Sequence, residues 1–138
     1  MATIFERIIA REIPAHVVYE DEKVIAFLDI SQATKGHTLL VSKTPYRNIL
    51  DMPDDEAGSV FAVASRLSKV LKEVFRADGL NVITNAEERA GQTVFHFHIH
   101  LIPRYTDDDM TIRFPNHADR LSEADYEERA KAIRAALS

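Results

Sequence analysis

Residues 93–102, TVFHFHIHLI, decide how the rest of the chain is interpreted. Histidine and apolar residues alternate through this segment, and successive side chains of a β-strand point to opposite faces of a sheet. The pattern therefore predicts a strand, closed by Pro103, with His96, His98 and His100 on one face. The other face, which we expect to pack in the core, carries Phe95, Phe97, Ile99 and Leu101.

The flanking sequence predicts the partners of this strand. Apolar, β-branched runs bounded by turn residues predict four further strands, at residues 16–20, 23–30, 37–42 and 80–84. Thr3 and Glu6 form a capping-box pattern for a short first helix, residues 54–78 carry the apolar period of a long helix, and Ser122 opens a last one. Together these elements predict an α+β, two-layer fold, a mostly antiparallel sheet of about five strands with helices on one side.

The length of 138 residues suits one domain, which we place at residues 1–104. Residues 105–138 change in character, because they are polar and irregular before the last helix begins. The apolar stripe of that helix is weak, and we expect it to pack on the domain or on a partner chain.

Composition excludes several classes of site. The chain has no cysteine, so it offers no disulfide, thiolate zinc ligand or cysteine nucleophile, which fits a reducing compartment such as the cytoplasm. We find neither a signal peptide nor an apolar run of about 20 residues that would span a membrane. A net charge of −5 disfavours binding to long nucleic acid but permits a small phosphate ligand.

The three alternating histidines admit three interpretations. They could be ordinary polar residues on the outer face of a sheet, or two of them could share a metal ion, because imidazole is a common ligand of zinc. In the third, one imidazole attacks a phosphorus atom while its neighbours stabilise charge on the phosphoryl oxygens. Clustered imidazoles disfavour each other's protonation, which would keep such a nucleophile neutral.

Longer segments resemble a known family. Residues 91–104, GQTVFHFHIHLIPR, look like the signature of the histidine triad (HIT) nucleotide hydrolases and transferases, in which histidines alternate with apolar residues after a Gly-Gln pair. Residues 4–43, IFERIIAREIPAHVVYEDEKVIAFLDISQATKGHTLLVSK, and residues 80–92, LNVITNAEERAGQ, resemble other parts of the same domain. The resemblance implies a HIT-like fold over residues 3–104.

The resemblance also implies a role for each histidine of the triad. His98 would be the nucleophile that forms a nucleotidyl-histidine on the α-phosphorus, and His100 would contact the phosphate. His96 would orient the nucleophile, helped by His37. His16, like His117, matches no role and is expected at the surface.

The remaining site residues follow from the same resemblance. Asn85, Gln92 and Thr93 would donate hydrogen bonds to ribose, phosphate or leaving group, and Asp29 would hold the ribose hydroxyls. The apolar slot for the base would be lined by Ile4, Phe5, Ile8, Phe27, Ile30 and Val94. Without a ligand, each of these apolar residues would also suit an ordinary core.

The sequence departs from the pattern of bacterial members of this family at a structural zinc site. Many of them carry two cysteines and a histidine that help to bind a structural zinc, where this chain has Thr3, Glu6 and Pro45. We therefore expect no metal site and no cofactor, and a homodimer, as in the family. The expected activity is hydrolysis or transfer at the α-phosphate of a purine nucleotide, either a nucleoside phosphoramidate or a dinucleoside polyphosphate. The alternative is a nucleotide-binding sensor or partner protein with little turnover.

Overall fold

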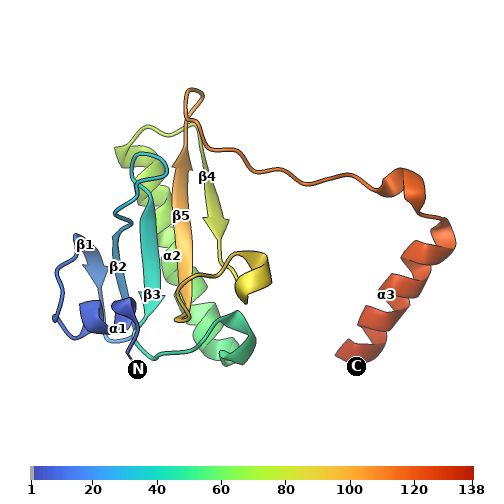
Figure 1. The fold of residues 1–138 in the computed structure, drawn as a ribbon, viewed down its shortest axis with the longest axis horizontal. Helices are drawn as coiled ribbons and strands as arrows, with labels where there is room; N and C mark the ends of the chain where they lie inside the picture. The colour runs from blue at the N-terminus through green and yellow to red at the C-terminus, as the bar shows by residue number, and fades with distance from the viewer. Residues whose placement is uncertain (1) are drawn as a thin grey trace.

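A computed structural model describes residues 2–138 and consists of a sheet, two helices packed on it and a protruding tail (Figure 1). The strands are β1 (Val17–Glu20), β2 (Val24–Leu28), β3 (Thr38–Ser42), β4 (Gly79–Ile83) and β5 (His98–Arg104), and the helices are α1 (Ile4–Ile9), α2 (Asp54–Val74) and α3 (Glu123–Leu137). All neighbours in the order β1-β2-β3-β5-β4 are antiparallel. The predicted α+β fold with five strands is confirmed.

The prediction for β5 is wrong at both ends. Pairing with β3 begins only at His98, so residues 93–97 lie beyond the end of both neighbouring strands and have no ladder to join. Pro103 is inside β5 and does not close it. The side of Pro103 that lacks an N–H faces a loop beyond the end of β3, where its carbonyl accepts a 2.6 Å hydrogen bond from the Thr34 hydroxyl.

Helices cover both faces of the sheet, whereas the sequence predicted helices on one side only. On one face α2 packs over alternate residues of the central strands, including Leu40, Phe97 and Ile99. On the other face α1 contributes Phe5 and Ile8 to a smaller cluster with residues of β2 and β3. The histidines of β5 therefore point toward the side on which α1 lies.

Phe95 was predicted to pack in the core, but its side chain lies partly at the surface. Its side chain is 37% exposed, and the Arg47 guanidinium lies over its ring with 4.3 Å between the guanidinium carbon and the ring centroid. Such a contact stabilises an exposed aromatic ring by cation–π attraction. Phe97, Ile99 and Leu101 are buried as expected.

Residues 105–138 leave the body of the molecule. The chain runs out past the β4 edge, and α3 stands clear of the sheet with no buried residue of its own (Figure 1). In the described part of the chain no helix is both long and apolar enough to cross a membrane.

Gly36 holds the loop before β3 against the far end of α2. Its φ of +93° lies in the left-handed region, and a Cβ atom at this position would approach two ring carbons of Phe75 to 2.7 Å. Both facts require glycine immediately before His37.

Replacing Gly36 with alanine is expected to lower the free energy of unfolding by about 2–4 kcal/mol, because backbone strain and overpacking add. The matched control is Gly58→Ala inside α2, where an added Cβ meets no atom within 4 Å. That change should raise stability by about 0.5–1 kcal/mol. Urea unfolding measures both, and equal effects would contradict the role assigned to Gly36.

Candidate active site

His98 is held in one tautomer by its own strand. Its Nδ1 lies 2.7 Å from the main-chain carbonyl oxygen of His96, which can only accept a hydrogen bond. Nδ1 therefore carries the proton, and Nε2 keeps a free lone pair. The ring packs edge-on against Phe5 with 4.9 Å between centroids. This fixes both the direction and the protonation state of the nitrogen that could attack.

His96 acts on His98 through its backbone and not through its ring. The ring is fully buried, and its Nε2 donates to the carbonyl of Ser42 at 2.6 Å. Its Nδ1 faces the Thr3 hydroxyl at 3.5 Å. Although it lies outside β5, His96 is thereby fixed beside the end of β3, and its carbonyl is positioned for His98.

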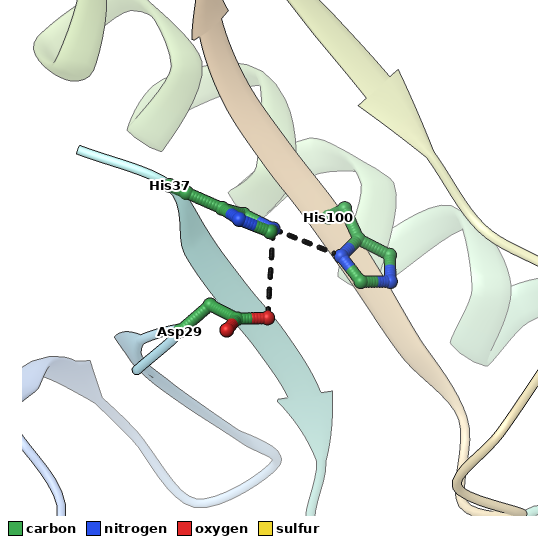
Figure 2. A group of neighbouring side chains, drawn as sticks. All are labelled: Asp29, His37 and His100. Carbon is green, nitrogen blue, oxygen red and sulfur yellow. Dashed lines mark hydrogen bonds and ion pairs between the residues drawn. The ribbon is translucent and has the colours of Figure 1, made fainter. Parts of the chain in front are cut away.

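His37 pairs with His100, whereas the resemblance implied that it would support His96. Its Nε2 lies 3.0 Å from His100 Nδ1 and 3.6 Å from an Asp29 carboxylate oxygen (Figure 2). The backbone N–H of Ala33 points at His37 Nδ1 from 3.3 Å. His37 Nδ1 is thus an acceptor, Nε2 carries the proton and donates to His100, and His100 keeps its own proton on Nε2.

The cluster therefore presents one hydrogen-bond acceptor, His98 Nε2, and one hydrogen-bond donor, the Nε2–H of His100. The rings of His98 and His100 lie 5.1 Å apart between centroids, so a ring with a bare nitrogen lies beside a ring with a free N–H. A tetrahedral phosphate group can meet both at once.

Gln32 holds the loop that sets this arrangement. Its side-chain amide donates to the carbonyls of Asp29 and His37, at 2.7 and 2.8 Å, and its oxygen accepts from the Gly36 N–H at 2.9 Å. These three bonds close residues 29–37 into a rigid turn and keep the Ala33 N–H aimed at His37. The sequence analysis missed Gln32, because a glutamine in a polar loop carries no distinguishing pattern.

Burial keeps the imidazoles neutral. It is the largest cause that lowers the pKa of His37 and of His98, and it lowers the pKa of His100 to about 4. Positive charge on the neighbouring histidines also lowers the pKa of His100, but less than burial does. Clustering, which the sequence suggested as the cause, is therefore the secondary effect.

Asp29 supplies the one negative charge among these groups. Burial alone would raise the pKa of its carboxyl, but two hydrogen bonds from Ser31 and the nearby His37 hold that pKa below its usual value. At neutral pH the cluster therefore consists of neutral imidazoles and a carboxylate, and the 3.6 Å contact between Asp29 and His37 is not a full ion pair.

A slot of about 430 Å³ opens beside the histidines, between α1 and the sheet. This volume is within the usual range of small-molecule sites. The slot contains every apolar residue that the resemblance implied, and its lining is Ile4, Phe5, Ile8, Ile13, Pro14, Ala15, His16, Phe27, Leu28, Asp29, Ile30, Leu39 and Val94. Phe5 joins the slot to His98, and Asp29 joins it to His37.

His16 and Ile30 complete the slot from its open side. His16 was expected to be an uninvolved surface residue, yet it lines the slot while remaining exposed. Ile30 also lines it, although its side chain is 96% exposed. An apolar residue left so open beside a cavity is available to cover a flat ligand.

The side chain of Gln92 hydrogen-bonds within the protein, whereas the resemblance implied that it would donate to the ligand. Its amide nitrogen donates to the carbonyls of Arg47 and Val94, and its oxygen accepts from Asn48 and from the Glu87 N–H. All its polar atoms are therefore engaged in holding the loop before the triad. Asn48, which is 2% exposed, was missed by the sequence analysis.

The side chains of Thr93 and Asn85 have few hydrogen-bond partners within the described residues. Thr93 is exposed, and Asn85 has only a 3.5 Å contact from its side-chain nitrogen to the Gly91 carbonyl. The hydroxyl of Thr84 donates to the carbonyl of His98 at 2.7 Å, which fixes the chain just before Asn85 to β5. Both polar groups are thus able to reach a ligand.

Asp29, His37 and His100 are also the residues most able to hold a metal ion. One ligand atom from each lies within 4.8 Å of the others. Aspartate and two neutral imidazoles are a ligand set that zinc accepts. The direct hydrogen bond between the two rings, however, already accounts for both nitrogens without an ion.

Comparison with known proteins agrees with this geometry. Residues 10–107 match the HIT domain family. A member of the HIT family from Bacillus subtilis is 41% identical, with a TM-score of 0.95 over 100% of this chain and 99% of its own. A Streptococcus mutans protein is 46% identical, with a TM-score of 0.93 over 99% of this chain and 85% of its own.

A third solved structure carries a functional description. A HIT family hydrolase from Clostridium thermocellum is 33% identical, with a TM-score of 0.68 over 82% of this chain and 96% of its own. The family match begins just after α1 and covers the whole sheet and His96, His98 and His100. The chain belongs to the HIT domain family.

Proposed function

We propose that the protein is a nucleotide hydrolase or transferase that acts on the α-phosphate of a purine nucleotide through a covalent intermediate on His98. The observation that carries this proposal is the tautomer pair, a bare Nε2 on His98 beside an N–H on His100. A pure binding site for phosphate would gain from two donors, whereas one lone pair beside one donor suits nucleophilic attack.

The first step follows from these atoms. The lone pair of His98 Nε2 attacks the α-phosphorus, and the bond from phosphorus to the leaving group breaks with its electron pair remaining on that group. Positive charge then develops on the His98 ring, where the His96 carbonyl stabilises the Nδ1 proton. His100 Nε2–H donates to a phosphoryl oxygen, on which negative charge increases.

The second step returns the enzyme to its starting state. Water attacks the nucleotidyl-histidine at phosphorus and the bond to Nε2 breaks, which releases the nucleoside monophosphate. With a phosphoramidate the leaving group takes one proton from solvent and departs as ammonia or an amine, and the proton that the attacking water loses returns to solvent. Thr93, which is exposed, and Asn85, which is half-buried and lightly bonded, are suited to hold the leaving group or ribose.

The slot suits a nucleoside. Its apolar walls of about 430 Å³ accept a flat base, and the Asp29 carboxylate lies between slot and histidines, where ribose hydroxyls would come. The Clostridium thermocellum relative is described as a hydrolase, which supports turnover over mere binding.

His98→Ala is expected to lower kcat/KM for adenosine 5′-phosphoramidate by roughly 10³-fold or more, because the attacking atom is lost. The measurement is steady-state AMP release with a chelator present. AMP binding by calorimetry should survive, and added imidazole should restore part of the activity to His98→Gly. If native protein and variant both bind AMP and neither turns over, the sensor alternative replaces catalysis.

The acidic limb of the pH profile should lie below pH 6.5. Protonation of His98 Nε2 removes the lone pair, and burial lowers the pKa of His98 in the folded protein. The midpoint of the acidic fall in kcat/KM is therefore expected below pH 6.5, the value of an ordinary histidine. A midpoint at or above 6.5 would mean that the attacking group is not a buried imidazole.

A further inference from the structure

The loop between β2 and β3, residues 29–37, decides which ring nitrogen of His100 carries the proton. The Ala33 N–H points at His37 Nδ1, so His37 Nε2 carries a proton and donates it to His100 Nδ1 (Figure 2). His100 therefore keeps its own proton on Nε2, where the proposed function needs a donor. A movement of the loop that turned the Ala33 N–H away would remove this constraint.

Loss of that constraint would change what the site can do. The hydrogen bond between the two rings can then run in either direction, from His37 to His100 or from His100 to His37. In the second case His100 carries its proton on Nδ1 and has a bare Nε2. His98 and His100 would then both offer lone pairs, and neither could donate to a phosphoryl oxygen.

The backbone of the loop is under strain at Gln32, next to the group that matters. The Ala33 N–H belongs to the peptide group that follows Gln32, so its direction depends on the Gln32 backbone. The φ of Gln32 is +42°, in the left-handed region, which costs free energy for a residue with a Cβ atom. Gln32 is also exposed, so water can compete for the hydrogen bonds of its side chain. Support from a buried part of the protein would therefore decide whether the loop keeps this conformation.

Thr34 provides a buried support. It follows Ala33 directly, it is 5% exposed, and its hydroxyl donates to the Pro103 carbonyl at 2.6 Å. Its own carbonyl accepts a 3.1 Å hydrogen bond from the His37 N–H. Thr34 thus joins β5 to the loop and to His37. Because Thr34 and Pro103 are both buried, water cannot easily replace the bond between them if the hydroxyl is removed.

Pro103 is suited to anchor the loop. Proline has no N–H, so at this point β5 offers the loop a carbonyl acceptor and an apolar ring but no donor. A Cβ atom on Gly36 would lie 3.2 Å from Cγ of the Pro103 ring, so the backbone of Gly36 packs directly on that ring. The loop therefore contacts Pro103 twice, through the hydrogen bond of Thr34 and through the packing of Gly36.

Tyr105 adds a second hydrogen bond beside the first. Its hydroxyl donates to the carbonyl of Lys35 at 2.6 Å. Burial and the nearby Asp108 carboxylate raise the pKa of Tyr105, so this hydroxyl keeps its proton. Two consecutive loop residues, Thr34 and Lys35, are thus bonded to the last turn of chain around the end of β5. Gln32 holds the loop before Ala33, and these two bonds hold it after Ala33.

We infer that Thr34 and Tyr105 are positioning residues that clamp the loop to the end of β5, so that the Ala33 N–H fixes the tautomers of His37 and His100. Neither side chain lines the slot, and both act through the backbone of the loop. The consequence for turnover rests on the proposed function. The tautomers themselves exist without any reaction and can be measured separately.

Nuclear magnetic resonance of ¹⁵N-labelled histidine rings tests the clamp. A protonated and a bare ring nitrogen differ in chemical shift, and comparison with His100→Asn assigns the His100 signals. In the native protein we expect a protonated Nε2 and a bare Nδ1 near neutral pH. Thr34→Val keeps the side-chain shape and should move both signals toward a mixture of tautomers, whereas Thr34→Ser keeps the hydroxyl and should resemble the native protein. A single native tautomer in Thr34→Val, or a mixture in the native protein, would overturn the inference.

Tyr105→Phe provides an independent test, which also serves if Thr34→Val does not fold. Tyr105 is half-buried, and its replacement removes one hydroxyl and should also mix the His100 tautomers. The matched control is Tyr19→Phe, which removes a hydroxyl that donates to Asp21 at 2.9 Å, away from the loop. A second control, Ser68→Ala, removes a hydroxyl bonded at 2.7 Å to a carbonyl within α2. Native signals in Tyr105→Phe, or equal changes in the controls, would contradict the clamp.

Kinetics then connect the clamp to turnover. For adenosine 5′-phosphoramidate, Thr34→Val should lower kcat by about 10-fold and change KM by less than about twofold, because the His100 donor acts mainly on charge that develops in the transition state. Thr34→Ser should restore kcat to within about twofold of the native value. A lower kcat with unchanged tautomers would show that Thr34 acts by another route and would refute the inference. If the native protein does not turn over, the proposed function fails, while the tautomer spectra still decide whether the clamp exists.

Discussion

The packing of one face of β5 against α2 is the constraint on which the rest of the molecule depends. Phe97, Ile99 and Leu101 are almost fully buried there, and because strand side chains alternate, His98 and His100 must point to the other face. A shift of one residue would bury the two imidazoles under α2 and expose the apolar residues. The free energy of the core thus also fixes the orientation of His98 and His100.

Much of this could be predicted from the sequence, since alternation and helical periodicity are local patterns. The five strands and the capping box of Thr3 and Glu6 are examples, whereas the residues of the apolar slot were implied only by the resemblance to the HIT family. What could not be predicted depends on where neighbouring elements end. Residues 93–97 alternate like a strand but have no partner to pair with, and Phe95 is covered by Arg47, a residue 48 positions earlier in the sequence.

The pairing of His37 was hidden for a related reason. Which histidine it reaches depends on the register of β3 against β5 and on a turn held by Gln32, neither of which leaves a periodic signal. In the structure, two different backbone groups set the tautomers of the two histidines. The His96 carbonyl sets the tautomer of His98, and an Ala33 N–H sets that of His100 through His37. Backbone groups, which no side-chain substitution can remove directly, therefore control the protons of the site.

The contact between Gly36 and Phe75 joins two regions that appear unrelated in the sequence. Phe75 terminates α2, whose other contacts belong to the core, while Gly36 precedes the histidine that orients His100. A larger side chain at position 75 would push against Gly36 and displace the loop that carries both Asp29 and His37. Selection for the shape of this helix end would thus also be selection for proton placement, so variants of Phe75 could alter turnover while the domain stays folded.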